Sequence, residues 1–191
     1  LEDFDAQPTI GKSSIITEKK EVAEEEINFE LKTATPQTAI NEIETESEET
    51  HLENFESKHP NLEVDNFENK NLENKNDPLH LIYNITFDDL DQKNKIKINP
   101  FLVKQYTKNP FKLNERDYPV DFGYPRNETY ILSLAVPKNY IVKKLPENKI
   151  FSLPNKGGRF ILSIKNIQNT INVYSNFTIN KKVYSSDEYH Y

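Results

Sequence analysis

The sequence predicts a mainly β fold, an antiparallel β-sandwich of the immunoglobulin or fibronectin type with one packed α-helix. Three observations lead to this prediction. Apolar and polar residues alternate in many short segments, turn-forming residues recur roughly every 8–12 residues, and only residues 44–59 show helical spacing. Strands do not alternate with helices, so a parallel nucleotide-binding sheet is not expected.

The first part of the chain is predicted to hold two strands and the helix. Residues 1–10 are polar and irregular, which is typical of a tail or linker. Residues 13–17 and 27–32 are strand candidates, and apolar and polar residues alternate clearly in the second. The helix is best defined over residues 48–58, and Pro60 is expected to end it.

From residue 61 onward, short strands are predicted to follow one another through tight turns. The clearest strand covers residues 79–87, and a turn at residues 88–94 is expected to join it to residues 95–99 as a hairpin. A helix start is predicted at residues 185–188. Other strands are predicted around residues 62–67, 118–122, 130–136, 140–145, 150–153, 160–165 and 171–179, with turns at residues 155–158 and 167–170.

The 191 residues are predicted to form one domain after the tail, because this length suits a single core. Within residues 11–191, residues 11–77 would supply acidic strands and the helix, and residues 78–191 the core sandwich strands. Residues 1–77 carry 21 acidic and 7 basic side chains, against 10 and 17 in residues 78–191. The two parts could face each other, or one of them could bind an anionic partner. The basic residues alternate with apolar ones, however, which favours an exposed sheet face that carries the basic residues.

Composition excludes several kinds of site. The chain has no cysteine, which excludes disulfides, thiolate metal sites and a cysteine nucleophile. It has no Gly-x-Ser-x-Gly elbow, no glycine-rich phosphate loop and no apolar run of about 18 residues that could span a membrane. Only three of 24 basic residues are arginine, which argues against nucleic-acid binding. Because the chain starts at Leu1 without a basic-then-apolar leader, we expect a fragment, a mature chain or a chain with residues missing.

Two groups of residues could bind metals, although ordinary structural roles are favoured for both. His51 and His59 are eight residues apart and would share one helix face, but the chain lacks a His-Glu-x-x-His motif. Asp88, Asp89 and Asp91 could bind calcium, but the glycine and glutamate of an EF-hand loop are missing. We therefore expect a surface helix and a turn, without a metal or another cofactor.

One stretch is distinctive enough to indicate a family. Its most specific part is Arg-Asp-Tyr-Pro-Val-Asp-Phe-Gly-Tyr-Pro at residues 116–125. With this stretch, residues 51–191 resemble the C-terminal region of Bacteroidetes transglutaminase-like proteins. The other matching motifs are Asn-Pro-Phe-Leu at 99–102, Asn-Pro-Phe-Lys at 109–112, Val-Pro-Lys-Asn-Tyr at 136–140, Leu-Pro-Glu at 145–147, Ser-Leu-Pro-Asn at 152–155 and Ile-Asn-Lys at 179–181.

The resemblance implies an accessory role. These proteins are secreted or periplasmic and carry a papain-like transglutaminase core followed by a β-rich domain of unknown function. The resemblance implies that this chain is that C-terminal domain, located in the cell envelope, and that it is not an enzyme because the core needs a cysteine nucleophile. Its implied partners are the catalytic core of the same polypeptide and a protein or glycan substrate.

The same motif supplies the candidate interaction loop. Two prolines bracket residues 120–124 and limit strand pairing, and Gly123 is expected to adopt a backbone angle that other residues resist. The loop is expected to pack against the rest of the domain or the catalytic core; a rigid corner between two sheets is the alternative. The candidate interaction residues are Arg116, Tyr118, Asp121, Phe122 and Tyr124.

The leading functional hypothesis is a non-catalytic accessory domain that docks on the catalytic core or positions its substrate. A stand-alone carbohydrate- or peptide-binding β-sandwich module is the main alternative, because the chain is rich in tyrosine and phenylalanine that could stack on sugars. An independent hydrolase with carboxylates from distant strands is the third hypothesis, although the sequence singles out no pair.

Overall fold

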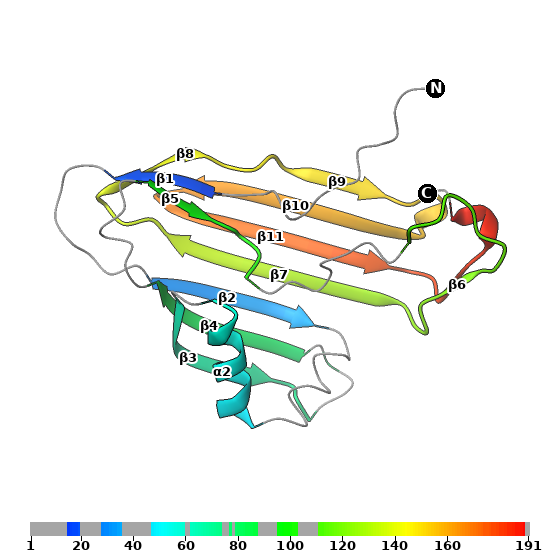
Figure 1. The fold of residues 1–191 in the computed structure, drawn as a ribbon, viewed down its shortest axis with the longest axis horizontal. Coiled ribbons are helices and arrows are strands. Elements are labelled where there is room, and N and C mark those ends of the chain that lie inside the picture. The colour runs from blue at the N-terminus through cyan, green and yellow to red at the C-terminus, as the bar shows by residue number, and fades with distance from the viewer. Residues whose placement is uncertain are drawn as a thin grey trace.

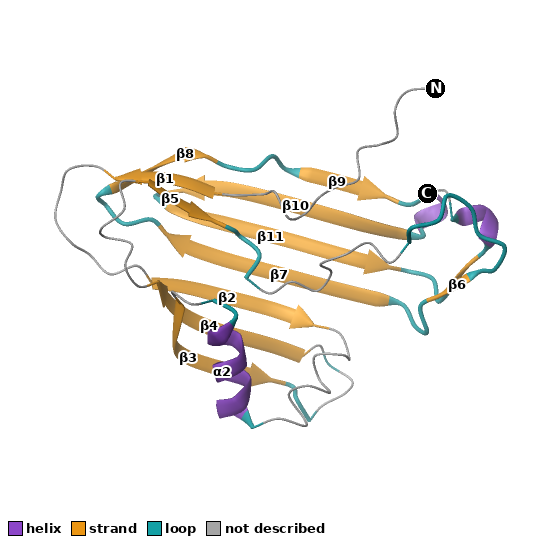
Figure 2. Cartoon of the chain, viewed as in Figure 1, coloured by secondary structure: helices purple, strands orange, loops and turns teal. Residues whose placement is uncertain are grey.

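The computed structural model describes residues 15–19, 28–35, 47–59, 62–73, 77, 79–87, 95–102 and 111–189. These residues form antiparallel sheets and one α-helix (Figures 1 and 2), so the predicted mainly β fold with a packed helix is confirmed. The expected tail at residues 1–10 and the turn at 88–94 lie outside the described residues. The turn contains the candidate calcium ligands Asp88, Asp89 and Asp91, which therefore also lie outside them.

The largest element is a seven-stranded antiparallel sheet with the order β3-β4-β2-β7-β11-β10-β9 (Figure 1). All eight residues of β2 pair with β4, and residues 29–34 also pair with β7. β2 therefore joins two groups of strands that are distant in the sequence. The strands span Leu62–Lys70 (β3), Leu79–Phe87 (β4), Asn28–Thr35 (β2), Arg126–Ala135 (β7), Thr170–Ile179 (β11), Gly158–Ile167 (β10) and Lys149–Ser152 (β9).

The long strands bury one face each, as the alternation predicts. On β4, residues 79, 81, 83 and 85 are buried while His80 and Asn84 are exposed. β10 and β11 form a hairpin whose two turn residues, Gln168 and Asn169, have φ values of 50° and 63°. Two consecutive positive φ values give a turn whose twist matches that of the strands. The predicted turn at residues 167–170 is therefore confirmed.

A smaller sheet covers part of the buried face. It contains β1 (Ile15–Lys19) between β5 (Lys95–Ile98) and β8 (Tyr140–Lys144), and Figure 1 shows β1 and β5 in front of the large sheet. Ile15, Ile96 and Tyr140 of this sheet belong to the same core cluster as the buried residues of β4, β7, β10 and β11. The main core therefore lies between two layers of strands.

The predicted hairpin between residues 79–87 and 95–99 is wrong. β5 pairs with β1 in the small sheet, whereas β4 pairs with β3 on one side and β2 on the other. Both edges of β4 are thus occupied, so the strand that follows it in the sequence must pair elsewhere. The sequence correctly predicted the position of β5 but not the strand with which it pairs.

Helix α2 (Glu48–Ser57) covers the other part of the same face, in front of β3 and β4 in Figure 1. The Ser47 hydroxyl caps its N-terminus by accepting a hydrogen bond from the Thr50 N–H at 3.2 Å. The ring of Phe55 stacks on Tyr83 at 4.8 Å, and the Tyr83 hydroxyl lies 2.8 Å from Nε2 of His51. Burial raises the pKa of Tyr83, so its phenol stays protonated in this contact.

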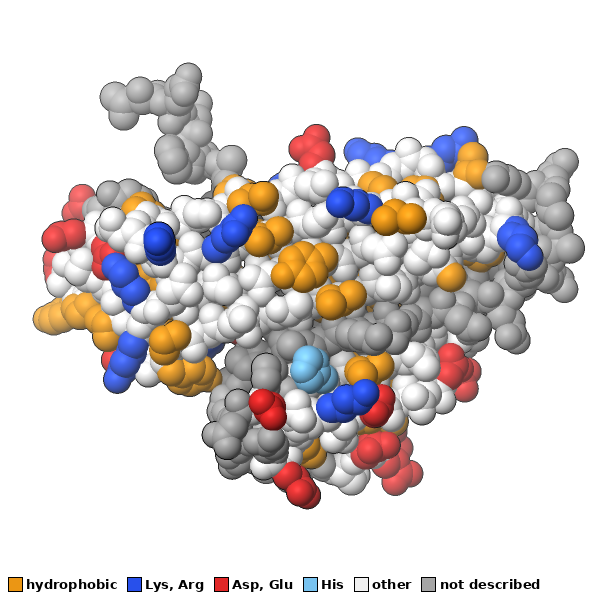
Figure 3. Space-filling view, turned by 180° about the vertical axis from the view of Figure 1, so that it is seen from behind, with side chains coloured by type: hydrophobic (Ala, Val, Ile, Leu, Met, Phe, Trp, Pro, Cys, Tyr) orange, Lys and Arg blue, Asp and Glu red, His pale blue; other side chains and the backbone are white. Residues whose placement is uncertain are grey.

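No described element covers the opposite face of the large sheet. Figure 3 shows apolar side chains gathered across the middle of this face. Alternation along the strands places Ile131, Ile150, Ile167 and Tyr174 there, and all four are exposed. The described elements thus cover one face of the sheet only.

Tyr130 of β7 ties the loop after β5 to the large sheet. Its buried hydroxyl donates a hydrogen bond to the Pro100 carbonyl at 2.7 Å and accepts one from the Leu102 N–H at 3.2 Å. Burial raises the pKa of this phenol as well, so it remains a donor across the physiological range. Two buried backbone groups therefore depend on a single hydroxyl.

We predict that Tyr130→Phe lowers the free energy of unfolding by about 1–3 kcal/mol, because it leaves those two backbone groups without a partner. Tyr174→Phe is a matched control on the neighbouring strand, where the ring is partly exposed, and should change stability by less than about 0.5 kcal/mol. Urea unfolding of both variants measures the difference. Equal losses would show that the Tyr130 hydroxyl is not needed.

Candidate functional site

One end of the large sheet carries a separate hydrophobic cluster; β6, at the right of Figure 1, lies at this end. There β6 (Val120–Asp121) pairs with β12 (Val183–Tyr184), beside the 3-10 helices η2 (Pro154–Lys156) and η3 (Ser186–Glu188). Val120, Ile179 and Tyr184 are its buried members. We call this end of the molecule, formed by residues 111–125, 153–158 and 179–189, the corner.

Tyr184 organises the corner. Its hydroxyl donates to the Gly157 carbonyl and accepts a hydrogen bond from the Lys181 N–H at 3.3 Å. A Cβ added to Gly158 would lie 2.7 Å from the Thr178 carbonyl oxygen, so the backbone passes too close for any side chain there. The corner is thus fixed by both hydrogen bonding and close packing.

Two side chains close the C-terminal end of the corner. The Lys181 ammonium forms a charge-assisted hydrogen bond with the Glu188 carboxylate, and the second Glu188 oxygen accepts the Ser185 N–H at 3.1 Å. The Ser185 and Glu188 side chains form a capping box on η3, which confirms the predicted helix start at residues 185–188. The hydrogen bond from Lys181 is the main cause that lowers the pKa of Glu188.

Two of the five candidate interaction residues, Phe122 and the exposed Asp121, shape the loop of the corner. Phe122 is half-buried, and its ring lies 5.5 Å from Tyr184 and 6.0 Å from Phe111 in edge-on contacts. Asp121 accepts a hydrogen bond from the Gly123 N–H at 2.7 Å. Gly123 has φ of 79°, the backbone angle expected from the sequence. These residues set the shape of the loop.

The other three candidate residues are exposed. Tyr118 keeps 76% of its surface in solvent, and the Arg116 Nε donates to the Tyr118 carbonyl at 3.0 Å. The ring of Tyr124 is partly exposed, and the guanidinium of Arg126 lies 5.2 Å from its centre in a cation–π contact. The sequence prediction therefore combined residues that shape the loop with residues that solvent can reach.

The corner also exposes apolar residues that the sequence analysis missed. Leu113 is 71% exposed and Val183 is 44% exposed. Leu113 is an isolated leucine in a polar stretch, which is the only signal that could have drawn attention to it. The predicted strand at residues 118–122 is wrong in length, because only Val120–Asp121 pairs, and it does so with β12.

The histidines that could have bound zinc have packing roles. His51 contacts Tyr83, and Nδ1 of His59 lies 2.8 Å from the Phe55 carbonyl oxygen. Among the residues that the structure describes, no group of three or more histidine, cysteine, aspartate or glutamate side chains could hold a metal ion. His51 thus joins α2 to the sheet, and His59 packs on Phe55 at the end of the helix.

The fold and the corner define a mainly β domain of antiparallel sheets with an exposed apolar surface at one end. Its sequence has no cysteine, and its described part has no helix long and apolar enough to cross a membrane. Residues 93–191 match the model of a domain of unknown function, DUF3858, and the chain belongs to this family. No curated protein and no solved structure matches the chain. The matched residues include the whole corner.

We predict that the corner loosens in acid. The folded pKa of Glu188 lies below its ordinary value of 4.5, so its stabilisation is complete above that value and is lost as pH falls through the folded pKa. Hydrogen exchange of the amides of residues 185–189 should accelerate over this range. Glu188→Gln should remove this pH dependence, whereas Asp187→Asn at the exposed neighbouring position should preserve it. An unchanged profile in Glu188→Gln would contradict the role of this carboxylate.

Proposed function

We propose that this chain is a non-catalytic accessory domain that binds a protein surface through its corner. The observation that carries this proposal is the group of exposed apolar and aromatic side chains on a firmly packed base. Exposed apolar and aromatic side chains that gather at one end of a molecule are typical of protein-binding sites. The group consists of Leu113, Tyr118, Tyr124 and Val183.

The base makes the corner suitable for binding. Phe122 and Tyr184 pack beneath the loop, and Asp121 fixes its turn through the Gly123 N–H. A surface that is already ordered loses less conformational entropy when it binds. Tyrosine and arginine are also enriched among residues that dominate binding energy, so Tyr118 and Arg116 are the expected anchors.

The proposed partner is the papain-like transglutaminase core of the same polypeptide, in the cell envelope. Support comes from the resemblance of residues 51–191 to the C-terminal region of transglutaminase-like proteins. The absence of cysteine agrees with catalysis residing in that core, since its mechanism needs a cysteine nucleophile. Docking through the corner would hold the domain beside the catalytic site, where it could position a protein or glycan substrate.

A second function is favoured by a different surface. On the uncovered face of the large sheet, Tyr174 is 41% exposed. Amide and hydroxyl groups flank it, with Asn172 on the same strand and Ser133 and Thr129 on β7. An aromatic ring beside hydrogen-bonding groups suits a sugar, so this face supports the alternative of a carbohydrate-binding module.

We predict that Leu113→Ala combined with Tyr118→Ala weakens binding to the separately produced catalytic core at least tenfold, about 1.4 kcal/mol. Both side chains are exposed, so the free energy of unfolding should change by less than about 0.5 kcal/mol. Calorimetric titration measures the affinity, and Tyr174→Ala on the uncovered face is the control. Loss of binding in the control alone would refute docking through the corner.

The identity of the partner is tested independently by the gene. It is expected to encode a papain-like core with cysteine, histidine and aspartate upstream of Leu1, and a gene without such a core would contradict the proposal. A glycan array tests the second function. Saturable binding that Tyr174→Ala abolishes would favour the carbohydrate-binding module over the docking domain.

A further inference from the structure

The two edges of the seven-stranded sheet differ in how they end. At the β3 edge, the Leu62 N–H donates to the His59 carbonyl at 2.9 Å and the Val64 N–H donates to Oε1 of Glu56 at 2.8 Å. The β3–β4 register also shifts between Val64 and Asn66, as a β-bulge requires. Bulges and covered edge groups are devices that prevent a further strand from pairing. Helix α2 and its flanking turn thus close the first part of this edge.

The β9 edge lacks these devices. The Leu153 N–H donates to the Gly158 carbonyl at 2.9 Å, and hydrogen-bonded and non-hydrogen-bonded pairs alternate along an antiparallel ladder. The N–H and C=O groups of Ile150 and Ser152 therefore point away from β10. No described strand pairs with β9 on that side. The edge offers a short row of backbone donors and acceptors.

Apolar side chains flank this row on both faces of the sheet. Ile150 is 62% exposed and pairs with Ile161 on the uncovered face. Phe151 points to the opposite face, where it is 46% exposed and stacks on Phe160 at 6.3 Å between ring centres. An added strand would find apolar surface on either side of its backbone.

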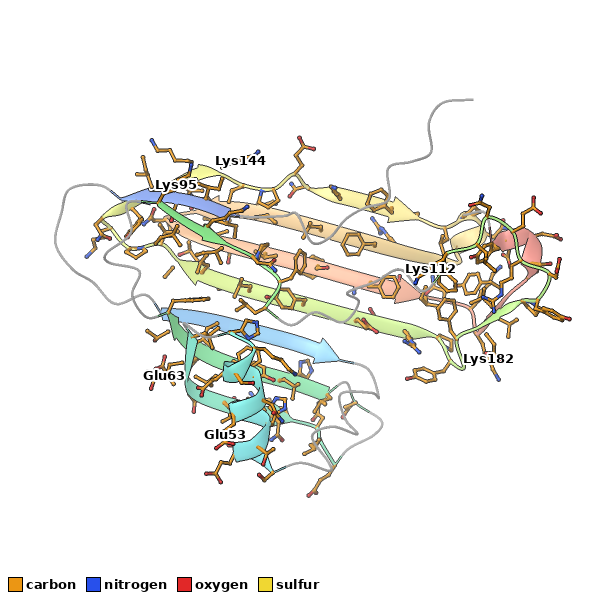
Figure 4. The ribbon with its side chains drawn as sticks, viewed as in Figure 1. Glu53, Glu63, Lys95, Lys112, Lys144 and Lys182 are labelled. Atoms are coloured by element: carbon orange, nitrogen blue, oxygen red, sulfur yellow. The ribbon has the colours of Figure 1, made fainter. Side chains whose placement is uncertain are left out.

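The charge around this edge is strongly positive. Residues 143–167 carry one acidic side chain, Glu147, and six basic ones: Lys143, Lys144, Lys149, Lys156, Arg159 and Lys165. Figure 4 shows Lys144 on the β8–β9 side of the molecule, and Glu53 and Glu63 on the opposite side, at α2 and β3. A second copy pairing β9 with β9 would bring these positive edges together, which is unfavourable.

From the open backbone, the apolar flanks and the positive charge, we infer that β9 binds an extended acidic segment of a partner polypeptide as an eighth strand. Main-chain hydrogen bonds to Ile150 and Ser152 supply affinity, and alternating apolar residues of the segment contact Ile150 or Phe151. Its acidic residues face Lys149 when its apolar residues contact Ile150, and Arg159 when they contact Phe151, because these two basic residues lie on opposite faces of the sheet. This site is separate from the exposed residues of the corner, so it does not depend on the proposed docking function.

The probe is a fluorescein-labelled peptide with the sequence Glu-Val-Asp-Ile-Glu-Val-Asp-Thr, titrated with the whole chain and followed by fluorescence anisotropy. We expect saturable binding that weakens as salt is raised. The amides of Ile150 and Ser152 should become protected from hydrogen exchange. A peptide with lysine at every acidic position should not bind.

Ile150→Pro is the decisive variant, since proline removes an N–H that points away from β10 and is tolerated at such an edge position. It should weaken binding at least tenfold, and Ile150→Val, which keeps the N–H, should bind as the original chain does. Lys149→Glu with Arg159→Glu should also weaken binding, whereas Lys95→Glu with Lys97→Glu at exposed positions of β5 makes the same change of charge away from β9 and should not; Figure 4 labels Lys95. If Ile150→Pro fails to fold, a probe N-methylated at alternate residues replaces it, because it cannot donate to the edge.

Three results would overturn the inference. The first is unchanged peptide binding by Ile150→Pro or by the N-methylated probe. The second is a dimer in sedimentation that Ile150→Pro dissolves, which would assign the edge to a second copy. The third is loss of peptide binding in Tyr118→Ala, which would place the peptide at the corner. None of these three results depends on whether the catalytic core binds the corner.

Discussion

The position of β2 between β4 and β7 is the constraint on which the rest of the structure depends. β2 pairs with β4 along its full length and with β7 over residues 29–34. It thereby joins the β3–β4 pair, packed under α2, to the group formed by β7, β11, β10 and β9. β4 and β7 lie about 50 and 100 residues from β2 in the sequence. Bringing these strands together therefore costs substantial conformational entropy of the intervening chain before any contact forms. Continuity of the large sheet therefore depends on one strand from the acidic part of the chain.

Continuity of the sheet determines where the core and the free surfaces lie. The β5-β1-β8 sheet and α2 cover adjacent parts of one face, and together they bury the inward residues of β4, β7 and β11. β9 extends beyond this cover, which explains why Phe151 stacks on Phe160 yet remains exposed. At the same end of the sheet, Tyr184 and Phe122 build a second small cluster that supports the corner. The incomplete cover thus creates both exposed features, the corner and the open edge.

The sequence predicted local structure well because alternation of side chains is a local property. Residues 79–87 and 171–179 were predicted as strands from their period of two, and both are strands with the expected buried faces. Pairing partners were not predictable in this way, since β5 pairs with β1 across about 80 residues and not with its sequence neighbour β4. At the corner, the motif predicted a loop, but the packing of Phe122 depends on Tyr184 of β12, which is distant in the sequence. Such contacts leave no periodic signal in the sequence.

The boundary of the DUF3858 match falls inside the sheets that the chain builds. Residues 93–191 contain β5 and β8, but β1, which lies between these strands and pairs with both, precedes the match. They also contain β7, whose neighbour β2 lies upstream. Without residues 15–35, β5 and β8 would lose their shared partner and β7 would become a second open edge with ten residues, far longer than the four of β9. A long, unprotected edge of this kind promotes aggregation, so the sequence upstream of the match is needed to complete the fold of the family domain in this chain.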